Sequence, residues 1–258
     1  MKEIENYFNK INLKDIDFEE KNTFQRWGDK MIINREGEPF PKLDASIEIA
    51  IIGAEEDRAS VRDKSSAKAP NAIRKYFYPL MPQDTKLRIV DLGNIKQGEK
   101  VNDTYFAICD VMTELLKNHI LPIILGGSND VAIGAYKAYA SISQIINIFN
   151  LDAKFDIISA EEPTTDENFL HEILCSEPNF LFDYTHAAYQ SYFVDNNAIK
   201  LLDELHFDHI RLGEVQKDLD KIEPFVRDAD MVMIDMNCVR QSDSPCGFSP
   251  HGLYGEEL

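Results

Sequence analysis

The chain has 258 residues, of which 44% are hydrophobic and 28% are charged, a balance typical of a globular protein with a sizeable core. Its formal net charge of −18 at pH 7 argues against a nucleic-acid partner, because phosphate binding needs a basic surface. The sequence has no run apolar enough to span a membrane, no apolar segment at its N-terminus and no CxxC spacing among its four cysteines. We therefore expect a cytoplasmic protein without a zinc site, a disulfide framework or a membrane partner.

The first 46 residues are charged and aromatic without a clear period, and we expect them to form an N-terminal arm that packs on one domain of residues 47–258. From residue 47 onward, apolar runs typical of strands buried on both faces alternate with stretches typical of helices. The expected strands are residues 47–54, 86–95, 121–127, 147–157, 179–185, 209–215 and 229–237. The expected helices are the stretch after Pro70 and residues 103–120, 128–140 and 187–205.

This alternation predicts an α/β fold of three layers, α/β/α, in which helices cover both faces of a mostly parallel central sheet. In such folds, ligands bind at the carboxyl ends of the strands. Three strand ends carry polar residues, in the segments GGSND (126–130), DAKFD (152–156) and MIDMN (233–237). We expect these three segments to meet at one edge of the sheet.

The segment DAKFD follows an apolar strand directly. If the strand continued, period-two spacing would point Asp152, Lys154 and Asp156 the same way, so two carboxylates would flank an ammonium group. Asp235 would join them from another strand end, and three carboxylates at one point repel one another and need a cation. Taken singly, each of these residues also fits an ordinary turn or capping role.

The three segments resemble, in order and spacing, the GGDHS, DAHxD and SFDxDxxDP motifs of the ureohydrolases, the family of arginase, agmatinase and formimidoylglutamase. The flanking segments IIGAEEDRAS, KAPNAIRKYF and GFSPHGLYGEE extend the resemblance over residues 47–258, with formimidoylglutamase-like members the most similar. The resemblance implies an arginase-like fold, an amidine or guanidine as small-molecule substrate, and two manganese ions that activate a water for hydrolysis. It also implies a homo-oligomer, and a chain shortened at its C-terminal end.

The metal ligands of this family are only partly matched. Three positions keep a typical ligand, namely Asp152, Asp156 and Asp235. Three positions carry a replacement, with Asn129 and Lys154 in place of histidines and Asn237 in place of a carboxylate. His171 matches the histidine that serves in proton transfer in the family, and an ordinary histidine on a helix face is an equal alternative.

Charge counting predicts what these replacements do. A full family site sets four carboxylates against two divalent cations, whereas three carboxylates here meet one ammonium group. A protonated lysine has no lone pair, so Lys154 would repel an ion at the second metal position, and we expect the two-metal site to be lost. Two states stay open for the first position. We favour a metal-free cluster held by salt bridges of Lys154, and the alternative is one hard ion (Mn²⁺, Mg²⁺ or Ca²⁺) bound by the surviving carboxylates and Asn129.

Three functions follow from these residues. The replacements favour a ureohydrolase-fold pseudoenzyme, in which the hydrolysis of C–N bonds in linear amidines is weak or absent. The surviving carboxylates and His171 favour an active amidine hydrolase with a single altered metal site. The oligomers that the family forms suggest a non-catalytic partner of an active paralogue.

Overall fold

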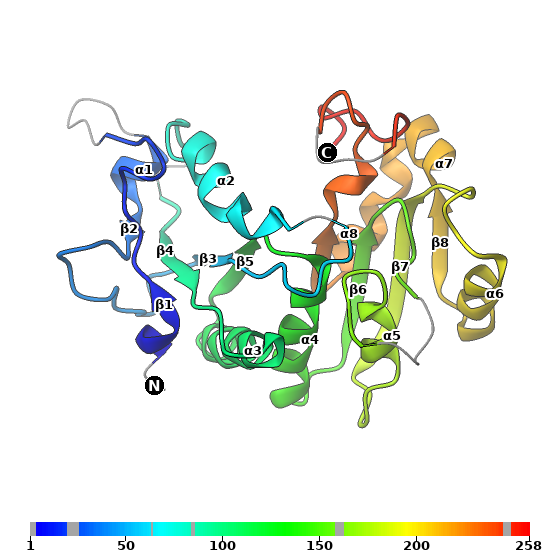
Figure 1. Ribbon diagram of the computed structural model, residues 1–258, viewed down its shortest axis with the longest axis horizontal. Helices are drawn as coiled ribbons and strands as arrows, with labels where there is room; N and C mark the ends of the chain where they lie inside the picture. Colours follow the sequence, from blue (N-terminus) through cyan, green and yellow to red (C-terminus); the bar gives the residue numbers. More distant parts are fainter. Residues whose placement is uncertain (1–3, 20–25, 63, 84–85, 158–162, 245–248) are drawn as a thin grey trace. The chain divides into compact units, whose positions relative to one another are not determined.

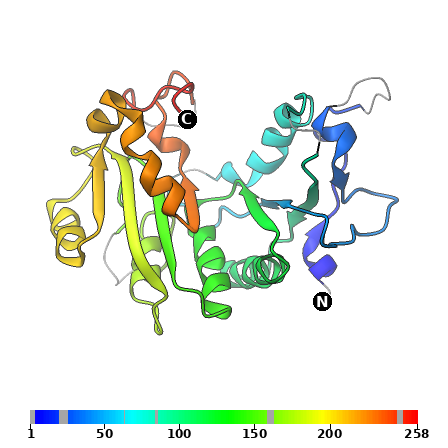
Figure 2. The ribbon, with the colours of Figure 1, turned by 180° about the vertical axis from the view of Figure 1, so that it is seen from behind.

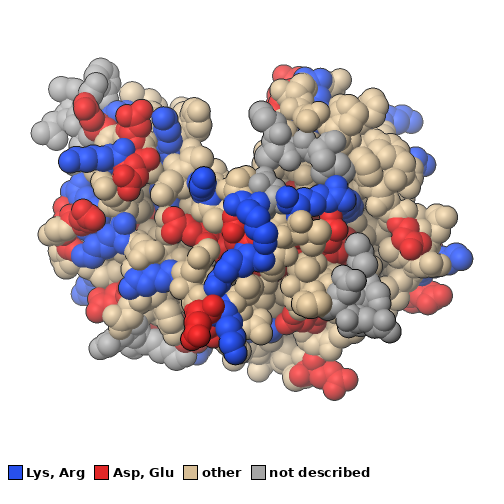
Figure 3. Space-filling model, in the orientation of Figure 1, with Lys and Arg blue, Asp and Glu red and all other residues tan. Residues whose placement is uncertain are grey.

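The computed structural model describes residues 4–19, 26–62, 64–83, 86–157, 163–244 and 249–258. The chain forms two compact units, Met1–Ile142 and Ser143–Leu258. Among the described residues, no helix is both long and apolar enough to cross a membrane. On the face drawn in Figure 3, acidic and basic side chains are interspersed, so the net charge of −18 is not gathered there in one acidic patch.

The first unit is built on a sheet of five strands. They are β1 (Phe8–Asn9), β2 (Ile32–Ile33), β3 (Ile49–Ala54), β4 (Ile89–Ile95) and β5 (Leu121–Leu125). The order is β1-β4-β3-β5, and β2 pairs with β4, as β1 does. All pairings are parallel except that of β1 with β4. The N-terminal segment therefore supplies two short strands to this sheet (Figure 1).

The helices of the first unit follow the strands along the chain. They are α1 (Trp27–Lys30), α2 (Ala69–Phe77), α3 (Val101–Lys117) and α4 (Ala132–Ser141), with 3-10 turns η1 (Ile4–Tyr7), η2 (Ser66–Lys68) and η3 (Asn129–Val131). Helix α2 is tied to β4 by a buried ion pair, in which the Arg74 guanidinium donates from Nε and Nη2 to the two Asp91 carboxylate oxygens, each at 2.8 Å. The Tyr78 hydroxyl also donates to Asp91, at 3.0 Å. These partners satisfy a carboxylate that is fully removed from solvent.

The second unit is built on a sheet of four parallel strands in the order β8-β7-β6-β9. They are β6 (Ile146–Leu151), β7 (Leu181–Tyr189), β8 (Asp208–Arg211) and β9 (Met231–Ile234). The helices are α5 (Phe169–Leu174), α6 (Asn196–Leu205), α7 (Leu212–Lys217) and α8 (Glu223–Asp228), with η4 (Leu219–Lys221) and η5 (Met236–Cys238). Figures 1 and 2 show α5 on one face of this sheet and α7 and α8 on the other, where a core around Phe149 and Leu151 holds them.

The expected α/β class with mostly parallel strands is confirmed, and the strands lie in two sheets. Several expected boundaries are wrong. The strand expected at 147–157 ends at Leu151. Residues 187–189 were expected in a helix but continue β7, because Ala187 and Ala188 are buried in the core and α6 begins only after its N-cap, Asp195, accepts from the Asn197 amide at 2.8 Å. The strand expected at 209–215 ends at Arg211, where α7 begins. The division into an arm of residues 1–46 and a domain of residues 47–258 stays a prediction.

Candidate metal centre

Two aspartates lie side by side because two parallel strands end together. Strands β6 and β9 pair in parallel with Leu151 opposite Ile234. Asp152 and Asp235 are the next residues of their strands, and the Asp235 amide donates to the Leu151 carbonyl at 3.0 Å. The expectation that the carboxyl ends of these strands meet at one edge of the sheet is therefore confirmed for this pair.

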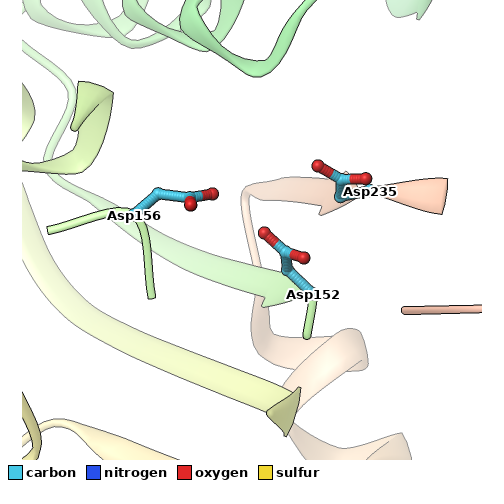
Figure 4. Close-up of side chains that lie close together, drawn as sticks. All are labelled: Asp152, Asp156 and Asp235. Carbon is cyan, nitrogen blue, oxygen red and sulfur yellow. The ribbon is translucent and has the colours of Figure 1, made fainter. Parts of the chain in front are cut away.

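The third aspartate arrives by a turn. Strand β6 ends at Leu151, so residues 152–156 do not keep the period-two geometry of a strand. Asp156 adopts a left-handed conformation with φ of 50°, which bends the chain back toward Asp152. One carboxylate oxygen from each of Asp152, Asp156 and Asp235 lies within 4.8 Å of the others, and Figure 4 shows the three groups converging.

The expectation that Asp152, Lys154 and Asp156 point the same way along a strand is wrong, because the strand stops before them. The Lys154 ammonium instead donates to the Glu167 carboxylate at 2.8 Å, and both side chains are largely buried. Lys154 still acts on the centre, since its charge is one cause that lowers the pKa of Asp156. Burial outweighs it, because the pKa of Asp156 is raised overall.

Two of the three carboxylates of the centre are buried, and all three lie close to one another. Asp152 is 1% exposed and Asp156 is 7% exposed. Burial raises the pKa of Asp152 well above its usual value, with the charges of Asp235 and Asp156 adding to the effect. Burial also raises the pKa of Asp156, to about 7, and a hydrogen bond from Asp152 opposes part of that rise. Without a cation, both carboxyl groups therefore hold a proton to higher pH than an exposed aspartate does.

Backbone groups aim two of these carboxylates. The Ala153 amide donates to Asp152 Oδ1 at 2.5 Å, and the Asp152 amide donates to the Ala187 carbonyl at 3.1 Å. Asp235 caps η5, because its Oδ1 accepts from the Asn237 amide at 2.6 Å. Asn237 thus lies next to the centre in the sequence and contacts Asp235 through its backbone.

Two further predicted site residues, Asn129 and His171, are described within their own units. Asn129 belongs to the first unit, where it begins η3 beside the buried Asp130, which accepts from the Tyr105 hydroxyl at 2.5 Å. His171 lies on α5, with its Nε2 at 3.5 Å from Cys175 Sγ. Among the described His, Cys, Asp and Glu residues, the structure groups three aspartates as a set of metal ligands, and His171 is not one of them.

Several residues beside the centre were not predicted. They are Glu167, which pairs with Lys154, and a buried set behind Asp152 that consists of Asn150, Tyr184 and His186. Tyr184 and His186 alternate in β7, and that polar alternation inside an otherwise buried strand is the signal that could have found them. Glu167 lies 13 residues beyond Lys154, and no periodicity connects the two.

Three clustered carboxylates suit a hard divalent cation. Mg²⁺, Ca²⁺ and Mn²⁺ take oxygen ligands, and one such ion would replace the protons that the buried acids otherwise take up. The three aspartates of the second unit are thus a donor set that suits one hard cation.

The fold and the centre define an α/β protein with a carboxylate site at the carboxyl ends of parallel strands. The model of the arginase family matches residues 47–253, and the chain belongs to the arginase family. The formimidoylglutamase of Staphylococcus haemolyticus is 29% identical over 228 residues, which cover 80% of this chain and 70% of that relative. The formimidoylglutamase of Hahella chejuensis is 26% identical over 236 residues, covering 84% of this chain and 72% of that relative.

Solved structures show the same fold. The Trypanosoma cruzi formiminoglutamase with Mn²⁺ superposes with a TM-score of 0.73 at 18% identity, covering 84% of this chain and 80% of that one. The formimidoylglutamase of Bacillus subtilis superposes with a TM-score of 0.75 at 18% identity, covering 95% and 83%. The predicted resemblance to formimidoylglutamase-like ureohydrolases is confirmed.

Proposed function

We propose that this protein is a formimidoylglutamase-like ureohydrolase that binds one hard divalent cation in place of two manganese ions. Its hydrolysis of linear amidines is therefore weak or absent. The observation that carries the proposal is the approach of three carboxylates, from Asp152, Asp156 and Asp235, to within 4.8 Å. Asn129 was a further predicted ligand, and its part in the site stays a prediction.

The ion pair of Lys154 with Glu167 favours a bound cation over the metal-free cluster that charge counting favoured. In that count, the Lys154 ammonium offset one of the three aspartates. Glu167 now supplies a carboxylate to the same ammonium at 2.8 Å. The three aspartates are left with an excess of negative charge in a buried place, which either protons or a cation must offset.

The residues also support the loss of turnover. A pair of divalent ions generates hydroxide from water at neutral pH, and this is the nucleophile that amidine hydrolysis requires. Lys154 cannot ligate an ion while protonated, and Asn237 offers a neutral amide where a second carboxylate would hold an ion. A single ion held by the three aspartates would supply charge neutralisation and Lewis acidity there, without a second ion to help activate the water.

The test is a metal count combined with an activity assay on the full chain. The protein is stripped with a chelator, dialysed against Mn²⁺, Mg²⁺ or Ca²⁺, and analysed by mass spectrometry for metal and by titration calorimetry. Hydrolysis of formimidoylglutamate, arginine and agmatine is measured with Mn²⁺, beside the Staphylococcus haemolyticus formimidoylglutamase as positive control. We expect one ion per chain and turnover at least 100-fold below the control.

Three outcomes would contradict the proposal. Two tightly bound manganese ions per chain would show that the replaced positions do not matter. If no ion binds, the site is the metal-free cluster instead. Turnover close to that of the control with one ion bound would identify an active hydrolase with a single altered site. The double variant Lys154→His and Asn237→Asp, which restores two positions of the family pattern within the second unit, is expected to gain a second ion.

A further inference from the structure

A hydrogen-bonded network of buried polar side chains lies directly behind the candidate centre. It crosses from β6 to β7 and ends on the backbone of Asp152. Asn150 Nδ2 donates to the Tyr184 hydroxyl at 3.1 Å, this hydroxyl lies 2.9 Å from His186 Nδ1, and His186 Nε2 lies 3.0 Å from the Asp152 carbonyl oxygen. Asn150, Tyr184 and His186 are at most 1% exposed, so this network lies in the interior and not on the surface.

The groups that can only donate or only accept fix the direction of each hydrogen bond in this network. The Asp152 carbonyl can only accept, so Nε2 of the His186 ring carries a hydrogen. The neutral ring then has a lone pair on Nδ1, which accepts from the Tyr184 hydroxyl. The oxygen of that hydroxyl in turn accepts from the Asn150 amide. Burial lowers the pKa of His186 to about 3, which agrees with a neutral ring. One tautomer therefore satisfies all of these groups at once.

His186 also contacts the other half of the loop of residues 152–156. The Phe155 ring packs edge-on against the imidazole, with ring centroids 4.7 Å apart and planes at 76°. Phe155 directly precedes Asp156, whose left-handed backbone turns its carboxylate back toward Asp152. The imidazole thus contacts the loop twice, through the hydrogen bond of Nε2 with Asp152 and through the ring contact with Phe155.

We propose that His186 is a positioning residue, which holds the loop of residues 152–156 in the bend that brings the Asp152 and Asp156 carboxylates together. The peptide groups of Asp152 are then held by β7 from two sides, since the Ala187 carbonyl accepts from its amide and His186 donates to its carbonyl. A cation site tolerates little displacement of its ligands, so loss of this support weakens binding. The inference rests on the one-ion site proposed above.

The test compares variants of His186 in the full chain. His186→Phe keeps a ring against Phe155 and removes the donor to Asp152. His186→Gln restores an amide donor at about the place of Nε2. His209→Phe is the matched control, because His209 lies opposite His186 in the sheet and 6.1 Å from the same Phe155 ring, while its Nε2 pairs with Asp203 at 2.9 Å. Tyr184→Phe removes the hydroxyl that selects the tautomer.

Two measurements are made on each variant. Titration calorimetry with Mn²⁺ gives the dissociation constant, which we expect to rise about 10- to 100-fold in His186→Phe, to recover substantially in His186→Gln, and to stay within about 2-fold in the control. Amide hydrogen exchange in the metal-free protein gives a second readout. The Ala153 amide, which donates to Asp152 Oδ1, should exchange at least 10-fold faster in His186→Phe, while the Leu253 amide, which donates to the Cys238 carbonyl, should not change.

The outcomes separate the two proposals. If the wild-type protein binds no ion, the one-ion site fails, and the exchange of the Ala153 amide alone decides whether His186 positions the loop. If His186→Phe binds Mn²⁺ as tightly as the wild type, or if Ala153 exchanges no faster than in the wild type, His186 is an ordinary core residue. Equal acceleration at Ala153 and Leu253 would mean general destabilisation, and would also overturn the inference.

Discussion

Replacing Asp235 with asparagine should have opposite effects on stability and on cation binding. Asp235 is the least buried of the three clustered aspartates, and its charge raises the pKa of both Asp152 and Asp156. Asparagine removes this charge and keeps an oxygen that can accept from the Asn237 amide, so the cap of η5 survives. The metal-free variant should therefore be more stable than the wild type at alkaline pH.

The size of the effect follows from the geometry. Two unit charges 4.8 Å apart repel each other by about 3.5 kcal/mol at an effective dielectric constant near 20, and by about 0.9 kcal/mol in water. Because the pKa values of Asp152 and Asp156 are both raised, we take about one charge on this pair to face Asp235 at pH 8. Since Asp235 is partly exposed, we expect a gain of about 1–2 kcal/mol in the free energy of unfolding at pH 8. The gain should vanish near pH 4, where Asp152 and Asp156 of the wild type are protonated.

The assay is urea unfolding in a chelator and in Mg²⁺ or Mn²⁺, with Asp220→Asn as a charge-matched control on an exposed residue of the same unit. At a concentration 100 times the dissociation constant, a bound cation should stabilise the wild type by about 2.7 kcal/mol. Asp235→Asn should lose most of that increment, and Asp220→Asn should keep it. If Asp235→Asn is less stable than the wild type in chelator, or if the cation stabilises both equally, the three carboxylates do not form a binding site.

Three further predictions test other parts of the structure. Because the pKa values of Asp152 and Asp156 are raised in the folded state, the native protein binds more protons than the unfolded chain, so the free energy of unfolding without metal should fall as pH rises from about 4 to 7. Saturating cation should remove that slope, and calorimetry in two buffers of different ionisation enthalpy should show proton release on binding near pH 6. Glu167→Gln removes a partner of the Lys154 ammonium, so cation affinity measured by calorimetry should fall about 3- to 10-fold, and an unchanged affinity would place Lys154 outside the field of the site. Asp91→Asn should cost about 3–5 kcal/mol in urea unfolding, because it leaves the buried Arg74 guanidinium without its charge partner, whereas Arg227→Ala, at an exposed pair with Glu223, should stay within about 0.5 kcal/mol.

The fold could be predicted largely from the apolar runs. Strands β3, β4, β5, β6 and β9 lie where continuous apolar segments predict them. β3, β4 and β6 are buried along most of their length, as such segments imply, whereas β5 and β9 were expected to be buried on both faces and are partly exposed. The boundary between β7 and α6 was missed, since residues 187–189 are small or aromatic and suit either element. What decides their state is the neighbouring strand, with Leu151 opposite Ala187, and a single sequence does not contain that pairing.

The site was predictable where it depends on strand ends and unpredictable where it depends on a turn. The proximity of Asp152 and Asp235 follows from the rule that the carboxyl ends of parallel strands meet at one edge. Both the motif and the register of the strands support this proximity. Their relation to Asp156 does not follow from that rule, because it depends on β6 stopping at Leu151 and on one left-handed residue. Because of that turn, Lys154 does not lie between Asp152 and Asp156 on a continuing strand, as the charge count had assumed. The lysine that matched the position of a metal ligand pairs with Glu167, and a cluster of two buried aspartates and the partly exposed Asp235 remains for a cation to neutralise.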